Sequence, residues 1–219
     1  MQHPGVHVPA CKEVHYFSKN WHHSKAWYYD HFKEAQPDQC CGEITPFYLF
    51  HPDVPKRIHS LLPRVKLLVL LRDPVERALS QVFHARKRGF EPLMPAEAIA
   101  AEPERLAGGD PESFQKHSYL ARSNYLEQMD RYESLFPPMQ LLVMQSEAFF
   151  NDPEPTWHQL QTFLGLEQIP IPETMPRANA GEADAQKVDS ALRTHLRELL
   201  GTTAVRVRER YGFGWDWAT

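Results

Sequence analysis

The sequence predicts an α/β protein in which a parallel sheet is flanked by helices. Residues 66–71 and 141–144 are short, almost wholly apolar runs, which are typical of strands buried on both faces of a parallel sheet. Each run is followed by a segment with helical periodicity. An alternation of strand and helix favours parallel pairing with right-handed crossovers, so both observations point to the same fold class.

The remaining elements follow from the signals that start and stop helices. We expect helices from Ser24 onward, over residues 52–62, 95–101, 118–135 and 153–164, and from about 185 to 200. Gly165 is the expected C-cap of the helix that precedes it. The aromatic residues Trp27, Tyr28 and Phe32 recur at helical spacing, which favours a place in the core over a substrate-binding platform.

The junction between residue 71 and the following helix is the most specific feature of the sequence. Asp73 is expected at the N-cap, with Pro74 at the first helical position and Glu76 at the third, in the arrangement called a capping box. Arg72 is then the first residue beyond the carboxyl end of the strand, where ligands of open α/β sheets bind. The turn is therefore a candidate binding site.

Arg72 and Ser80 are the candidate anion ligands at this turn. Ser80 falls outside the apolar stripe of the predicted helix, so it is not an obvious core residue. A guanidinium can give two parallel N–H bonds to a phosphate, and a hydroxyl can give one more. The alternative is structural: Arg72 pairs with the carboxylate of Asp73 or Glu76, and Ser80 is a solvated helix residue.

Composition narrows the class of function. The chain has 219 residues, of which 42% are hydrophobic, and this is enough to fill the core of one domain. The formal net charge of −4 argues against a general nucleic-acid-binding protein. The histidines and cysteines have no metal-ligand spacing, so we expect no metal site.

The cysteines and the hydropathy pattern bear on the compartment. Cys11 and the vicinal pair Cys40 and Cys41 do not form a disulfide framework, which indicates a reducing compartment. The sequence has no apolar run of membrane-spanning length and no signal-peptide pattern. We therefore expect no membrane segment and a cytoplasmic location.

Short motifs along the chain carry a family resemblance. They are K-E-V-H-Y-F at residues 12–17, G-E-I-T-P at 42–46, L-R-D-P-V-E-R-A-L-S at 71–80, F-L-G-L at 163–166 and F-G-W at 213–215. In this order they resemble the sulfotransferases that use 3′-phosphoadenylyl sulfate (PAPS), particularly the heparan sulfate sulfotransferases and their bacterial relatives. The resemblance implies a P-loop-NTPase-like, three-layer α/β fold built as a single sulfotransferase domain over residues 1–219.

The resemblance assigns the acceptor side of the reaction to the first motif. Glu13 matches the residue that acts as catalytic base in this branch, and His15 matches one that assists it. By period two, a strand over residues 12–17 would place both side chains on one face. Some relatives have an aspartate where this chain has Ser18. The alternative is that Glu13 is an edge-strand residue paired with Lys12.

The resemblance assigns the nucleotide side to later segments. Arg72 and Ser80 match the residues that bind the 3′-phosphate of PAPS. Arg177 and Asn179 lie where relatives have a basic nucleotide-contacting segment, although the sequence here lacks the Lys-Gly character of that segment. All four are cofactor-binding candidates.

The implied activity is transfer of a sulfuryl group from PAPS, as co-substrate, to a hydroxyl or amine acceptor, with a glycan favoured by the resemblance. The family opens with a strand and a Lys- and Gly-containing loop that holds the 5′-phosphosulfate, and the sequence contains no such loop. We therefore expect a domain that lacks its first strand and phosphate loop, and whose activity needs an upstream segment. The alternative is a non-catalytic module of the same fold that only binds or interacts.

Overall fold

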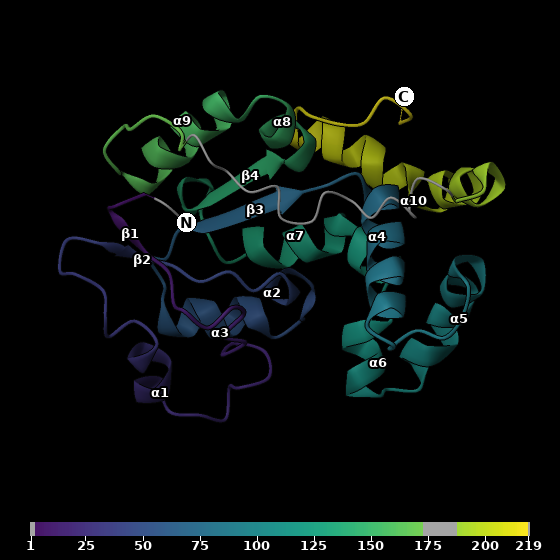
Figure 1. Ribbon diagram of the computed structural model, residues 1–219, viewed down its shortest axis with the longest axis horizontal. Coiled ribbons are helices and arrows are strands. Elements are labelled where there is room, and N and C mark those ends of the chain that lie inside the picture. Colours follow the sequence, from purple (N-terminus) through teal and green to yellow (C-terminus); the bar gives the residue numbers. More distant parts are fainter. Residues whose placement is uncertain (1–2, 173–187, 219) are drawn as a thin grey trace. The chain divides into compact units, whose positions relative to one another are not determined.

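A computed structural model of the protein describes residues 3–172 and 188–218 (Figure 1). Its elements in chain order are β1 (Val6–His7), α1 (Lys25–Asp30), β2 (Cys40–Cys41), α2 (Phe47–Phe50), α3 (Val54–Leu61), β3 (Leu67–Leu71), α4 (Pro74–Lys87), α5 (Pro95–Ala107), α6 (Pro111–Lys116), the 3₁₀ turn η1 (Ala121–Ser123), α7 (Tyr125–Glu133), the 3₁₀ turn η2 (Pro138–Gln140), β4 (Leu141–Gln145), α8 (Ser146–Asn151), α9 (Pro153–Leu164) and α10 (Ser190–Tyr211).

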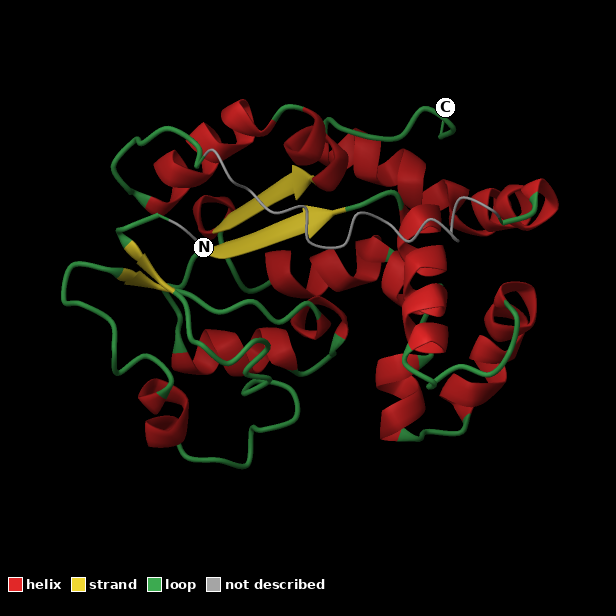
Figure 2. Cartoon of the chain, in the orientation of Figure 1, coloured by secondary structure: helices red, strands yellow, loops and turns green. Residues whose placement is uncertain are grey.

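The predicted strands β3 and β4 form a sheet. Figure 2 shows their arrows side by side and pointing the same way, which confirms the predicted parallel α/β arrangement. The side chains of β3 alternate: Val69 and Leu71 are buried, whereas Leu68 and Leu70 are 40% and 45% exposed. The prediction that β3 is buried on both faces is therefore wrong, because only one face of the strand packs. A second parallel pair joins β1 and β2, with Val6 opposite Cys40.

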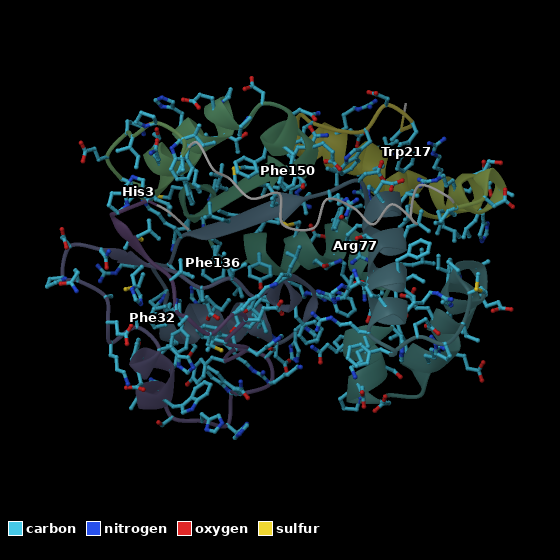
Figure 3. All side chains as sticks on the ribbon, in the orientation of Figure 1. His3, Phe32, Arg77, Phe136, Phe150 and Trp217 are labelled. Atoms are coloured by element: carbon cyan, nitrogen blue, oxygen red, sulfur yellow. The ribbon has the colours of Figure 1, made fainter. Side chains whose placement is uncertain are left out.

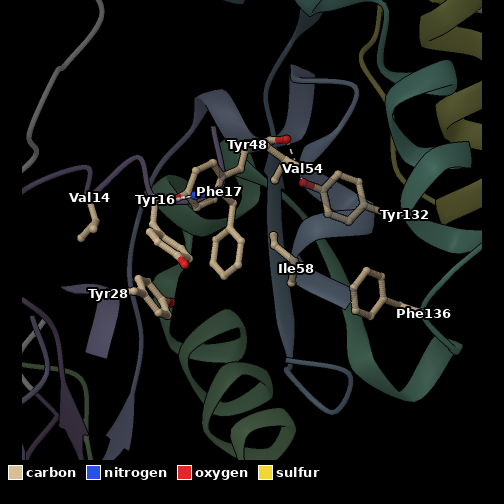
Figure 4. Close-up of a cluster of buried hydrophobic side chains, with 9 residues drawn as sticks. All are labelled: Val14, Tyr16, Phe17, Tyr28, Tyr48, Val54, Ile58, Tyr132 and Phe136. Atoms are coloured by element: carbon tan, nitrogen blue, oxygen red, sulfur yellow. Dashed lines mark hydrogen bonds between the residues drawn. The ribbon is translucent and has the colours of Figure 1, made fainter. Parts of the chain in front are cut away.

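The described residues form two compact units. The first comprises residues 3–69, 128–144 and 148–172, and the second comprises residues 70–127, 145–147 and 188–218. The core of the first unit is largely aromatic (Figure 4) and consists of Val14, Tyr16, Phe17, Tyr28, Tyr48, Val54, Ile58, Tyr132 and Phe136. The core of the second unit is largely aliphatic and consists of Val75, Leu79, Val82, Ala85, Ala98, Ile99, Tyr119, Leu196 and Leu200.

The aromatic stripe over residues 27–32, in α1 and the turn after it, packs in the core of the first unit. Tyr28 is 5% exposed, and Trp27 and Phe32 pack against the cluster around it. The prediction that this stripe belongs to the core is thus confirmed. Gly165 follows α9 with a φ of +76°, the left-handed conformation expected of a glycine C-cap.

The segment expected to form one helix over residues 118–135 is instead a 3₁₀ turn followed by α7. The backbone N–H groups of Leu120 and Ala121 donate to the buried carboxylate of Glu102, at 2.6 and 2.8 Å. This side-chain acceptor at the start of the segment favours a 3₁₀ turn and a separate α7 over one continuous helix. Two other helices run past their predicted ends, α5 to Ala107 and α10 to Tyr211.

Candidate functional site

The turn between β3 and α4 is organised around Asp73. Its Oδ1 accepts hydrogen bonds from the backbone N–H groups of Val75 and Glu76, at 2.8 and 3.1 Å, and Pro74 occupies the first helical position. The N-cap predicted from the sequence is therefore correct. Because Pro74 has no N–H and the next two amides are bound by Asp73, an anion at this turn needs donors from side chains.

The predicted capping box does not form. Glu76 makes an ion pair with Arg193 on α10 instead of reaching back to the backbone of Asp73. The N–H of Asp73 donates to Oε1 of Glu147 at 2.8 Å, and Oδ2 of Asp73 accepts from the indole N–H of Trp217 at 2.6 Å. Long-range partners thus hold the turn where the sequence predicted a local one.

Arg72 and Ser80 lie at this turn and on the second turn of α4, and both are half-buried. The backbone oxygen of Arg72 accepts a hydrogen bond from the hydroxyl of Tyr125 at 2.8 Å, which fixes the peptide. Within the described residues, no hydrogen bond or ion pair engages the Arg72 guanidinium or the Ser80 hydroxyl. The structural alternative, an ion pair of Arg72 with Asp73 or Glu76, is not formed there.

Arg77 belongs to the same motif but already has partners inside the protein (Figure 3). Its guanidinium donates to Oγ of Ser123 at 2.6 Å, to Oε1 of Gln81 at 2.7 Å and to the backbone oxygen of Tyr119. Burial lowers the pKa of Arg77 from its usual value. Through these three hydrogen bonds the residue ties α4 to the segments that follow it.

Residues 12–17 form a turn-rich loop, so the prediction of a strand is wrong there. Glu13 and His15 have φ angles of +60° and +55°, the left-handed region that side chains other than glycine rarely adopt. The backbone oxygen of His15 accepts from the N–H groups of Ser18, Lys19 and Asn20, which closes the loop on itself. A strand cannot run through this segment, because the backbone at Glu13 and His15 lies outside the β region.

The loop brings the two predicted acceptor-side residues together. Nε2 of His15 lies 3.3 Å from Oε2 of Glu13, and their side chains are 14% and 35% exposed. Oγ of Ser18 lies 3.1 Å from Nδ1 of His15 and 3.3 Å from its backbone oxygen. With Nε2–H of His15 donating to Glu13, Nδ1 of the neutral ring is an acceptor for the Ser18 hydroxyl, so the serine orients the ring from its other side.

Three residues that the sequence did not single out hold this loop. The side chain of Asn20 donates to the backbone oxygen of Val14 at 2.9 Å. The hydroxyl of Tyr48 accepts from the N–H of Phe17 at 3.2 Å, and Arg57 donates to the backbone oxygens of Phe17 and of Ser18 at 2.9 and 3.1 Å. Only the motif at residues 42–46 pointed to this neighbourhood, and it assigned no role to Tyr48 or Arg57.

The half-buried carboxylate of Glu43 contacts the same tyrosine, Tyr48. It accepts hydrogen bonds from the hydroxyls of Thr45 at 3.1 Å and Tyr48 at 3.1 Å. Burial raises the pKa of Glu43, and the hydrogen bonds from Thr45, Tyr28 and Tyr48 offset only part of that rise. Burial and the nearby Glu43 charge raise the pKa of Tyr48, so its phenol keeps its proton.

The other predicted features have simpler outcomes. Arg177 and Asn179 lie outside the described residues. In the part of the chain that the structure describes, no three His, Cys, Asp or Glu side chains gather as metal ligands. No helix among the described residues is long and apolar enough to cross a membrane.

A family model described as the Sulfotransferase family matches residues 10–170. The chain belongs to the sulfotransferase family. Over 169 residues, the chain is 28% identical to heparan sulfate glucosamine 3-O-sulfotransferase 5 of Homo sapiens, a match that covers 75% of the chain and 47% of that protein. Over 167 residues it is 30% identical to heparan sulfate glucosamine 3-O-sulfotransferase 3B1 of Mus musculus, with 76% and 41% covered.

The chain spans about half the length of the curated relatives it matches. Its fold is similar to the crystal structure of a sulfotransferase from Alicyclobacillus acidocaldarius, with a TM-score of 0.82 and 25% sequence identity. That match covers 100% of this chain and 90% of the other. The fold class expected from the sequence is therefore confirmed.

Proposed function

We propose that this protein transfers a sulfuryl group from PAPS to a hydroxyl or amine group of a carbohydrate acceptor. The observation that carries the proposal is the extent of the family match. It spans residues 10–170 and so includes the Glu13–His15 pair as well as Arg72 and Ser80. An acceptor-side base and a nucleotide-side anion site are the two functions that this reaction requires of the protein.

On the acceptor side, we assign the general base to Glu13. Its Oε2 faces Nε2 of His15, so Oε1 is the atom that would accept the proton of the acceptor hydroxyl or amine. His15 fixes the orientation of the carboxylate, and as an imidazolium it would also stabilise negative charge that develops nearby. Ser18 supports the ring from the other side.

On the nucleotide side, we assign the 3′-phosphate to Arg72 and Ser80. The donors available at the turn suit this ligand, because the carboxylates of Asp73 and Glu76 are held by other partners and leave the guanidinium to an anion. PAPS would supply the activated sulfuryl group. The protein would contribute binding of the phosphate, orientation of the acceptor and removal of its proton.

The carbohydrate acceptor is supported by the relatives, whose names specify heparan sulfate glucosamine. We therefore propose a glycan with free hydroxyl or amine groups as the acceptor class. Heparan sulfate chains are the first acceptor to test.

The test measures binding and transfer with the full 219-residue chain. Calorimetry with 3′-phosphoadenosine 5′-phosphate (PAP) and with 5′-AMP is expected to show a preference for PAP. Arg72→Ala should reduce that preference by about 10- to 100-fold, because a charge-assisted bidentate contact contributes roughly 1.5–3 kcal/mol. Arg64→Ala is the matched control, since Arg64 is exposed and lies just before the other end of β3.

Transfer is measured as label moved from ³⁵S-PAPS to heparan sulfate. Incorporation that depends on Arg72 supports the proposal. Equal affinity for PAP and 5′-AMP would refute the phosphate site. Preferential binding of PAP without incorporation into any glycan, both in the 219-residue chain and after addition of an upstream strand and phosphate loop, would favour the non-catalytic binding module instead.

A further inference from the structure

The loop that carries Glu13 and His15 stores backbone strain. Both residues have positive φ angles, and left-handed conformations of this kind persist only where the surrounding structure enforces them. Between them, the buried side chain of Val14 is 3% exposed and belongs to the aromatic core. Their unusual backbone therefore depends on contacts that the loop makes with the rest of the first unit.

A chain of hydrogen bonds reaches this loop from inside the unit. Thr45 and Tyr48 donate to the Glu43 carboxylate, and the Tyr48 hydroxyl in turn accepts the N–H of Phe17 at 3.2 Å. A phenol has one hydrogen to donate, so giving it to Glu43 turns an oxygen lone pair toward Phe17. Figure 4 shows Tyr48 bridging the aromatic core to the backbone of Phe17.

The backbone of Phe17 is also held from a second side. Nη1 of Arg57 donates to the backbone oxygens of Phe17 and Ser18, and Nη2 of Arg57 donates to Oδ2 of Asp53 at 2.9 Å. The N–H of Phe17 is thus fixed by Tyr48 and its oxygen by Arg57. Because Phe17 lies two residues after His15, holding its backbone fixes the point at which the strained turn ends.

We propose that Tyr48, oriented by Glu43, is a positioning residue that keeps Glu13 and His15 in the geometry needed for acceptor deprotonation. The proposal rests on the function assigned above to these two residues. Tyr48 itself would touch neither the acceptor nor the nucleotide. It would act through the peptide N–H of Phe17 and so through the backbone of the loop.

The charge state of Glu43 is part of this arrangement. The groups around its carboxylate are the hydroxyls of Thr45, Tyr28 and Tyr48, with the His31 imidazole nearby. An ionised carboxylate accepts all three hydroxyls, whereas a protonated one would compete for a lone pair. Glu43→Gln keeps the shape and removes the charge, which should loosen the Tyr48 hydroxyl without opening a cavity.

The first variant for the test is Tyr48→Phe. It removes one oxygen and retains the ring, which packs edge-on against Phe17 with a centroid distance of 5.7 Å. The matched control is Tyr132→Phe, because Tyr132 is also a buried phenol and donates one hydrogen bond, at 2.8 Å, to the backbone oxygen of Tyr48. The two variants lose one buried hydroxyl each, but only the first deprives Phe17 of its acceptor.

The readouts are amide hydrogen exchange and NMR signals of the His15 ring in the full chain. Tyr48→Phe should speed exchange of the Phe17 amide about 3- to 10-fold and change the His15 ring signals, and Glu43→Gln should act in the same direction. Tyr132→Phe should leave both readouts as in the parent chain. In the transfer assay, Tyr48→Phe should lower kcat about tenfold with unchanged PAP affinity.

Failure of this proposal and failure of the proposed function have different signatures. If the parent chain binds no PAP and transfers no sulfuryl group, the proposed function is wrong, while the exchange and ring signals still report on Tyr48. If Tyr48→Phe leaves the Phe17 amide and the His15 ring unchanged, or changes them without lowering kcat in an active protein, Tyr48 is not a positioning residue. Should Tyr48→Phe fail to fold, Glu43→Gln decides by the same criteria.

Discussion

The contact between Trp217 and Asp73 provides a quantitative test of what holds the turn between β3 and α4. Asp73 Oδ1 caps α4 through two backbone N–H groups, while Oδ2 accepts the indole N–H of Trp217 at 2.6 Å. Arg197 lies 5.8 Å from the Trp217 ring centroid and adds a cation–π contact. A hydrogen bond therefore joins the C-terminal segment, at Trp217, to Asp73, the residue that precedes α4.

The expected cost follows from these bonds. Asp73→Ala removes an N-cap, worth about 1 kcal/mol, and the acceptor of a charge-assisted hydrogen bond, worth about 1.5–3 kcal/mol. The free energy of unfolding should fall by roughly 2.5–4 kcal/mol. Trp217→Phe removes only the donor, so in a double-mutant cycle the two residues should show a coupling energy of about 1–3 kcal/mol.

Urea unfolding followed by circular dichroism measures these values without relying on the fluorescence of the mutated residue. Asp110→Ala is the matched control, because Asp110 also precedes a proline and caps a helix, α6, where its side chain accepts the N–H of Ser113 at 2.7 Å. Asp110→Ala should destabilise the protein less than Asp73→Ala. Equal effects, or a coupling energy near zero, would show that Trp217 does not hold the turn.

Two further predictions concern buried or catalytic carboxylates. Burial alone would raise the pKa of Glu91, but hydrogen bonds from Arg105, from the Leu93 N–H and from Tyr119 outweigh it and lower the pKa to about 2. The stabilisation from this group is therefore complete above about pH 4.5 and is lost as the pH falls toward 2. Glu91→Gln should cost about 3 kcal/mol at pH 7 in urea unfolding, and a gap that does not narrow below pH 4.5 would contradict this assignment. Glu13→Gln should lower sulfuryl transfer by about 10²-fold or more while PAP affinity changes little, and a loss of PAP affinity as large as that of Arg72→Ala would make Glu13 structural.

Local chemistry was enough to predict several features from the sequence. The Asp73 N-cap, the left-handed Gly165 after α9 and the core-facing stripe of α1 depend on residues within one or two turns of each other. The parallel pairing of β3 with β4 follows from the order of strand and helix. The motifs at residues 12–17 and 71–80 likewise located the candidate site residues, because the family resemblance is carried by contiguous segments.

Partners far apart in the sequence decided the rest. Glu76 was expected to complete a capping box, but its carboxylate forms an ion pair with Arg193, which lies 117 residues further along the chain. The alternating pattern of residues 12–17 indicated a strand, yet Tyr48 and Arg57, 31 and 40 residues from Phe17, hold this segment as a strained turn. The sequence by itself determined which residues are candidates for the chemistry, whereas tertiary hydrogen bonds decided their backbone conformation, because left-handed geometry at Glu13 and His15 is unfavourable until distant groups enforce it.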